Sequence, residues 1–144
     1  MTEASDWAAP LVITRKSDGS LRICVDHTKL NRHVRRPTHP TRTPRDAVAE
    51  ISGDATYFST FDAASGYKFL RASMGLSSSS DEYNRRADLA FQGVGKTVRV
   101  VDDLLRYDSS FPEHVMGVCA VLSAARDAGI TFNIKKFQFA QPQV

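Results

Sequence analysis

Apolar residues recur along this chain with two periods, one at alternate positions and one at every third or fourth position. The first period predicts short strands and the second predicts helices. Residues 11–16 and 21–26 are β-prone runs on either side of Ser17-Asp18-Gly19-Ser20, where the glycine can take a positive φ. We expect a hairpin here. The following stretch, 31–42, is rich in proline and arginine, which excludes a continuous helix and favours a surface connection.

The middle of the chain predicts a helix, a strand and a second helix. Thr43 and Pro44 have the residue types of an N-cap and a first helical position, so we expect a helix over 44–52. The aromatic run 56–61 predicts a strand that leads directly into Asp62. A helix is expected over 81–91, and the serines at 77–80 are compatible with either a linker or the approach to its N-terminus.

The last third predicts a second hairpin and a long helix. Residues 97–101 and 104–107 are strand-like and flank Asp102-Asp103, which we expect at the turn. A capping-box spacing at Ser110–Glu113 precedes a helical apolar period over 112–128. Strand-like residues follow at the end, over 130–134 and 137–139. Because strands and helices are mixed without a βαβ repeat, the predicted fold class is α+β.

Composition restricts the class of protein further. The 144 residues are 42% hydrophobic and 24% charged, as in one globular domain, and the 8 Gly and 6 Pro are unexceptional. No apolar run approaches the ~20 residues of a membrane span, and the acidic start of the chain is unlike a signal peptide. We therefore expect an intracellular protein, cytoplasmic or nuclear and not secreted, without a membrane partner. Cys24 and Cys119 are too far apart for a zinc or disulfide pattern and are expected to be small buried residues. The four histidines, His27, His33, His39 and His114, lack a metal-binding spacing and are expected at the surface or in loops.

Basic residues are concentrated near the N-terminus, although the net charge is only +3. Seven arginines and lysines lie between Arg22 and Arg45, and Asp26 is the only acid among them. Such a run is compatible with an ordinary solvated surface or with a face that binds nucleic-acid phosphates. The candidate nucleic-acid contacts are Arg32, Arg35 and Arg36.

Three aspartates are the candidate catalytic residues. Asp62 follows one predicted core strand, and Asp102-Asp103 follows another. If these strands are neighbours, the carboxylates repel one another unless cations lie between them, and Mg²⁺ prefers such oxygen ligands. The arrangement would then be a two-metal site for phosphoryl transfer. An isolated Asp-Asp pair is also common in solvated turns.

The order of the motifs resembles the fingers and palm of a reverse transcriptase of the gypsy-like long-terminal-repeat retrotransposon family. The resemblance covers nearly the whole chain and rests on several segments in family order: Trp7–Val12, Arg15–Asp26, Lys29-Leu30-Asn31, Tyr57–Asp62, Ser65-Gly66-Tyr67, Met74-Gly75-Leu76, Val101–Leu105, and Ala128–Asn133 with Lys135-Lys136.

This resemblance implies an RNA-directed DNA polymerase that acts on an RNA or DNA template with a primer and uses deoxynucleoside triphosphates. It implies two Mg²⁺ ions, with Mn²⁺ as a possible substitute, held by Asp62, Asp102 and Asp103 as catalytic and metal-binding residues. The implied nucleotide-binding residues are Lys16, Arg22, Tyr67, Met74 and Gly75. The implied fold is a palm, an antiparallel sheet packed on helices, with a β-hairpin in the fingers, forming a single domain over 1–144 that is fingers-like over 1–53 and palm-like over 54–144.

The chain departs from the family pattern at several points. The family places a strand–loop–strand insert after the Ser-Gly-Tyr element, whereas Tyr67–Leu70 joins the flanking elements directly, so about twenty residues are expected to be missing. Val100 replaces the usual tyrosine of the Tyr-x-Asp-Asp motif, and 77–80 replaces an Asn-Ala-Pro stretch. The resemblance stops before the thumb, so thumb and RNase H are expected to be absent. A non-catalytic nucleic-acid-binding remnant of a retroelement is therefore the alternative hypothesis, and the oligomeric state stays open.

Overall fold

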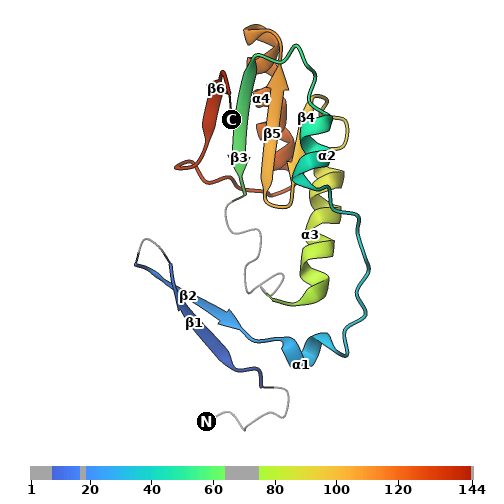
Figure 1. The fold of residues 1–144 in the computed structure, drawn as a ribbon, viewed down its shortest axis with the longest axis vertical. Coiled ribbons are helices and arrows are strands. Elements are labelled where there is room, and N and C mark those ends of the chain that lie inside the picture. Colours follow the sequence, from blue (N-terminus) through green and yellow to red (C-terminus); the bar gives the residue numbers. More distant parts are fainter. Residues whose placement is uncertain (1–7, 17–18, 64–74, 144) are drawn as a thin grey trace. The chain divides into compact units, whose positions relative to one another are not determined.

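The computed structural model describes residues 8–16, 19–63 and 75–143. They form two compact units: residues 1–38 with 67–82, and residues 39–66 with 83–144. Each unit is built from two separate stretches of the chain, and the expected fingers-like and palm-like regions, 1–53 and 54–144, stay predictions. Helices and antiparallel strands are mixed throughout (Figure 1), and the predicted α+β class is confirmed. None of the helices in the described ranges is long and apolar enough to cross a membrane.

The first unit contains the predicted hairpin. Strands β1 (Leu11–Arg15) and β2 (Leu21–Val25) pair antiparallel, and Gly19 takes a positive φ of 82° in the connection. The apolar side chains of this two-stranded ribbon are largely exposed: Leu11, Ile13 and Leu21 are each at least 60% exposed. A short helix, α1 (Thr28–Asn31), follows where Asp26 accepts hydrogen bonds from the backbone and hydroxyl of Thr28.

Helix α3 (Ser77–Ala90) begins earlier than predicted and includes the four serines, so the linker interpretation of 77–80 is wrong. Asn31 explains the early start. Its side-chain oxygen accepts a hydrogen bond from the backbone N–H of Ser77 at 2.9 Å, and its amide donates to the Gly75 carbonyl at 2.9 Å. A residue distant in the sequence thus satisfies one of the free N–H groups at the helix N-terminus.

The second unit is built on a four-stranded antiparallel sheet in the order β4-β5-β3-β6. Its strands are β3 (Tyr57–Asp62), β4 (Thr97–Val100), β5 (Asp103–Asp108) and β6 (Gln138–Gln141). The hairpin of β4 and β5 was predicted. The strand expected over 130–134 is wrong, because only an isolated bridge between Phe132 and Ala63 forms there and the last strand begins at Gln138.

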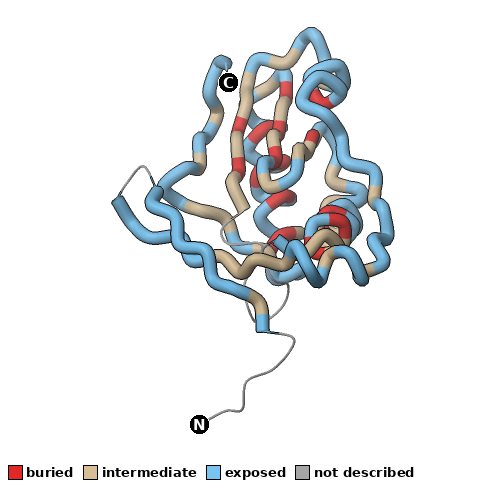
Figure 2. The backbone as a smooth tube through the Cα atoms, turned by 60° about the horizontal axis from the view of Figure 1, so that its bottom comes forward, coloured by how far each residue is buried: buried red, intermediate tan, exposed pale blue. Residues whose placement is uncertain are grey.

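Helices α2 (Pro44–Ala49) and α4 (Phe111–Asp127) belong to the same unit, and both were predicted. Thr43 forms a complete capping box with Asp46 at the start of α2, and Ser110 accepts the Glu113 N–H at the start of α4. One face of the sheet packs on α4 around Phe61, Leu104, Val118 and Val121 (Figure 2). Phe132 and Phe137 lie 5.0 Å from the Phe61 ring, measured between centroids. The aromatic residues near the C-terminus therefore close this core.

Two sequence-based expectations about single residues are wrong. Cys119 is exposed and Cys24 only half-buried, so neither is a fully buried small residue. The histidines were expected at the surface or in loops, but His114 is completely buried in α4. Its polar neighbours explain how an imidazole is tolerated there, as described below.

Candidate functional site

The two predicted acidic positions meet at one end of the sheet of the second unit. Asp62 ends β3 and Asp103 begins β5, and the antiparallel register places them directly opposite each other. Asp102 lies in the turn between β4 and β5, where its carbonyl accepts a hydrogen bond from the Ala63 N–H at 3.0 Å. The fold therefore brings together the three carboxylates that the sequence separates by about forty residues.

Electrostatics at this end of the sheet favours an added positive charge. Burial raises the pKa of the Asp102 carboxyl, and the negative charges of Asp103 and Asp62 raise that pKa further. Its Oδ1 atom is buried without a hydrogen-bond partner among the described residues. An unpaired buried carboxylate oxygen is costly, and a cation satisfies it better than a neutral donor does.

Lys136 supplies one such charge. Its ammonium group donates to Oδ2 of Asp62 at 2.8 Å, and this bond, together with the Asp62 charge, raises the pKa of Lys136. The lysine side chain is 63% exposed. The sequence analysis assigned no role to Lys136, and its position at Asp62 depends on the turn over 133–136 that precedes β6.

The oxygen ligands that the three carboxylates offer suit a hard divalent cation, but the carboxylates do not form a complete metal-binding site. No three His, Cys, Asp or Glu side chains within the described ranges are gathered closely enough to surround a metal ion. The all-carboxylate donor set and the unpaired oxygen of Asp102 match what Mg²⁺ and Mn²⁺ require, since these ions keep several waters and take few protein ligands. Oδ2 of Asp62 is paired with Lys136, so a metal ion at that oxygen would compete with the ammonium group.

A cavity of about 480 Å³ adjoins the carboxylates on the sheet face opposite α4. Because cross-strand partners share a face, Thr60, Leu105 and Val98 lie beneath it. Helix α2 contributes Ala47 and Val48, and Asp62, Asp103 and Lys136 lie at the charged end. The pocket is thus apolar except beside the acids.

The other predicted site residues belong to the first unit or lie outside the described residues. Lys16 and Arg22 are exposed on the hairpin, and Arg32 and Arg35 are exposed after α1. Gly75 takes a φ of 88°, and a Cβ atom there would lie 3.3 Å from the Val25 carbonyl oxygen, so glycine is required. Tyr67 and Met74 are outside the described residues.

Arg36 differs from its basic neighbours. Its guanidinium contacts the carboxylate of Asp81, which is 3% exposed, with Nε at 2.6 Å from Oδ2. The pair raises the pKa of Arg36. This arginine therefore attaches the connection over 32–38 to helix α3, and it is less available to a phosphate than Arg32 and Arg35 are.

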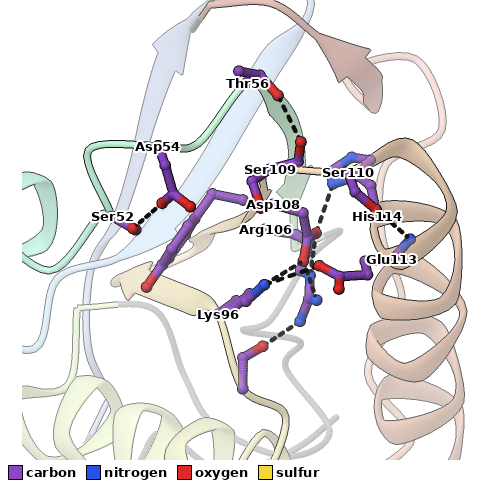
Figure 3. A network of polar contacts seen from close by, with 12 residues as sticks. Ser52, Asp54, Thr56, Lys96, Arg106, Asp108, Ser109, Ser110, Glu113 and His114 are labelled. Carbon is purple, nitrogen blue, oxygen red and sulfur yellow. Dashed lines mark hydrogen bonds and ion pairs between the residues drawn. The ribbon is translucent and has the colours of Figure 1, made fainter.

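A buried polar network that the sequence did not reveal lies around Asp108, at the opposite end of β5 from Asp103 (Figure 3). His114 contacts Asp108 through Nδ1 at 2.8 Å and Ser59 through Nε2 at 2.7 Å, and Arg106 donates to both oxygens of Asp108 at 2.7 and 2.5 Å. The Ser59 hydroxyl oxygen also accepts the Ala140 N–H at 3.0 Å. In the tautomer protonated at Nδ1, the imidazole donates to Asp108 and accepts from the Ser59 hydroxyl.

This Ser-His-Asp arrangement has the connectivity of a hydrolytic triad but not its accessibility. Ser59 and His114 are 0% exposed and Asp108 is 1% exposed, so no substrate reaches the hydroxyl. Its role is to join β3, β5, β6 and α4. Arg106 and Asp108, two residues apart on one strand, gave the available sequence signal, because they must share the sheet face that packs on α4.

Comparisons with known proteins agree with this architecture. No family model matches the chain. The chain is 29% identical over 166 residues to the Transposon Tf2-3 polyprotein of Schizosaccharomyces pombe, covering 95% of the chain and 12% of the relative. It is 26% identical over 163 residues to the uncharacterized protein K02A2.6 of Caenorhabditis elegans, covering 96% of the chain and 13% of that protein. The chain therefore spans about one eighth of the length of these relatives.

Solved structures identify the fold. The foamy viral protease-reverse transcriptase dRH in complex with double-stranded DNA matches with a TM-score of 0.87 and 16% identity, covering 100% of this chain and 29% of that one. The native Prototype Foamy Virus protease-reverse transcriptase matches with a TM-score of 0.78 and 19% identity, covering 96% of this chain and 22% of that one. The resemblance to retrotransposon reverse transcriptases is confirmed at the level of fold and sequence similarity.

The alignment also bears on the expected internal shortening. Of 144 residues, 95% is about 137, so the 166 aligned positions include about 29 with no counterpart in this chain. This excess is comparable to the roughly twenty residues expected to be missing after the Ser-Gly-Tyr element.

Proposed function

We propose that this chain, which has a reverse-transcriptase fold and is similar to retrotransposon polyproteins, is the fingers and palm portion of an RNA-directed DNA polymerase. The observation that carries the proposal is the meeting of Asp62, Asp102 and Asp103 at one end of the sheet, with a buried Asp102 oxygen that has no hydrogen-bond partner among the described residues. The foamy viral relatives of this fold bind double-stranded DNA or an RNA/DNA hybrid. We extend that partner class to this chain, with a primed template and a deoxynucleoside triphosphate as substrates.

Asp62, Asp102 and Asp103 are the residues that would hold two Mg²⁺ ions, for which Mn²⁺ can substitute. When bound, such ions activate the attacking oxygen and stabilise the leaving one in phosphoryl transfer. The chain itself contributes the negative end of the sheet, which Asp62 and Asp103 form by cross-strand pairing. Lys16 and Arg22, exposed on the hairpin, are proposed to bind the triphosphate through charge-assisted hydrogen bonds.

Tyr67, Met74 and Gly75 are proposed nucleotide contacts that rest on the resemblance alone. The assignment of 1–53 to the fingers and 54–144 to the palm stays a prediction, as does a cytoplasmic or nuclear location.

Primer extension tests the function directly. The folded chain is incubated with an RNA template annealed to a DNA primer, deoxynucleoside triphosphates and either Mg²⁺ or Mn²⁺. We expect template-directed elongation that requires the divalent ion. A chain that is folded by circular dichroism, binds the primed template and still adds no nucleotide in either ion would contradict the polymerase proposal.

The non-catalytic alternative is favoured by one observation, the absence of about 29 aligned positions that the polyprotein relatives possess. Under this alternative, Arg32 and Arg35 would bind nucleic-acid backbone without chemistry at the carboxylates. The two functions separate in one comparison, because binding without elongation supports the alternative and elongation excludes it.

Neutralising Arg32 and Arg35 is expected to weaken RNA binding uniformly across sequences. Each lost phosphate contact lowers the salt slope of log K by roughly 0.7–0.9, so the double change to glutamine should lower it by about 1.4–1.8. Fluorescence anisotropy at several salt concentrations measures this. Arg126→Gln, at a guanidinium that is 80% exposed in the second unit, is the matched control. An unchanged slope in the double variant would contradict a phosphate-binding role for these arginines.

Removing the Lys136 charge is expected to strengthen metal binding. The ammonium competes for Asp62 Oδ2, and a unit charge about 4 Å away in water is worth about 1 kcal/mol, or roughly fivefold in affinity. Isothermal titration of Mn²⁺ into Lys136→Met measures the gain, and Lys135→Met is the control at the neighbouring exposed lysine. Weaker binding in Lys136→Met than in Lys135→Met would mean that the lysine supports the site and does not compete with metal.

A further inference from the structure

The turn that carries Asp102 is held in a conformation that its sequence disfavours. Val101, between β4 and β5, has a φ of 53°, which lies in the left-handed region. A β-branched residue rarely adopts this region because its side chain crowds the backbone. Contacts outside the turn must therefore offset the strain, and they determine how the next residue, Asp102, is presented.

Arg99 makes these contacts. Arg99 is the second-last residue of β4, and its Nη1 donates to the Val101 carbonyl oxygen at 2.6 Å. The same nitrogen donates to Oδ1 of Asn84 at 2.9 Å, and Nη2 donates to the Asn84 carbonyl at 3.1 Å. Asp88 Oδ1 accepts from Nη2 at 2.5 Å and from Nε at 3.2 Å. All five N–H groups of the guanidinium are used, and the side chain is 10% exposed.

The helix that receives these bonds is itself fixed within the same unit. Asn84, 3% exposed, donates to the Thr41 hydroxyl at 3.1 Å. His39 Nε2 lies 2.6 Å from Oδ2 of Asp88. The part of α3 beyond residue 82 is thus joined to the chain over 39–41, and Arg99 transmits that attachment to the turn. A planar guanidinium whose N–H groups are all hydrogen-bonded has little freedom to move.

We infer that Arg99 is a positioning residue for the carboxylate site: it holds the Val101 peptide in its left-handed conformation and so presents Asp102 to the cation. This inference rests on the proposed function. The backbone of Asp102 is fixed on both sides, by Arg99 through the preceding carbonyl and by the Ala63 N–H through its own. The buried, unpaired Oδ1 of Asp102 lies at the end of this restrained segment.

A rescue experiment separates this role from simple packing. Arg99→Gln is compared with wild type, with Val101→Gly and with the double variant by titrating Mn²⁺ into each folded chain. Outer-shell partners of metal ligands typically contribute 10–100-fold in affinity, so Arg99→Gln should lose at least about tenfold. Glycine occupies positive φ freely, so the double variant should recover to within about threefold of Val101→Gly alone. Arg126→Gln again serves as the charge-matched control.

Three results decide the inference. Wild-type affinity in Arg99→Gln overturns it, as does a folded double variant that stays as weak as Arg99→Gln, because the contacts to Asn84 and Asp88 would then carry the effect. If Arg99→Gln does not fold, the double variant is compared with Val101→Gly directly, and recovery of both folding and affinity supports the inference while failure of either overturns it. Absence of Mn²⁺ binding by folded wild type would instead refute the metal site itself, and with it this inference.

Discussion

Asparagine at position 102 is expected to abolish primer extension while leaving the chain folded. The substitution keeps the shape of the side chain and removes the charge that a divalent cation requires, so the loss should be at least about a thousandfold, the scale on which removing a catalytic carboxylate acts. Extension assays in Mg²⁺ and in Mn²⁺ at equal folded concentration measure it. Glu113→Gln is a matched control on α4, where the carboxylate pairs with Lys96 and not with the acidic end of the sheet.

Asp102→Asn is expected to lower activity but to raise the stability of the metal-free chain. Burial and the charges of Asp103 and Asp62 raise the pKa of Asp102 above its ordinary value, 3.8. The folded state therefore holds this proton more tightly than the unfolded state, and the stability that it contributes below that value is lost as pH rises through the folded-state pKa. Without metal at neutral pH, Asp102→Asn should be more stable than wild type by up to about 1 kcal/mol.

Urea unfolding of both chains across acidic and neutral pH checks this sign, and added Mn²⁺ should stabilise only wild type. A variant that loses extension because it has unfolded, or one that extends primers at the wild-type rate, would contradict the assignment of Asp102.

Alanine at position 108 is expected to destabilise the second unit by about 3–5 kcal/mol, a large part of the 5–15 kcal/mol that stabilises a typical domain. The carboxylate accepts two bonds from Arg106 and one from His114, all inside the protein. Without it, the buried Arg106 guanidinium keeps, among the described residues, its bond to the Gly95 carbonyl alone, and the His114 imidazole loses its partner at Nδ1. Unpaired buried charge is the reason for the large expected value.

Equilibrium unfolding in urea measures the change, with Asp127→Ala as the control at a carboxylate that is 74% exposed. The control should change stability by less than about 1 kcal/mol. If Asp108→Ala is no more destabilised than Asp127→Ala, the network contributes nothing to folding. A side chain at Gly117 would also disturb this network, because a Cβ atom there would overlap the Arg106 guanidinium.

Local chemistry alone determined much of the fold. The hairpin around Gly19, the capped helices after Thr43 and Ser110, and the hairpin whose turn contains Asp102 follow from turn and cap preferences that act within a few residues. The three aspartates could be selected from sequence because each follows a strand. Where the prediction failed, a distant residue decided the outcome: Asn31 starts α3 four residues before the expected Asp81.

The tertiary structure alone decided which side chains act together. Asp62 faces Asp103 because of strand register, and Lys136 reaches Asp62 across 74 positions of sequence. His114 is buried because Asp108 and Ser59, six and fifty-five residues away, satisfy both ring nitrogens. Local propensities act over one turn of chain, whereas pairing of charges and buried hydrogen bonds depends on distance in space, which the sequence order does not contain.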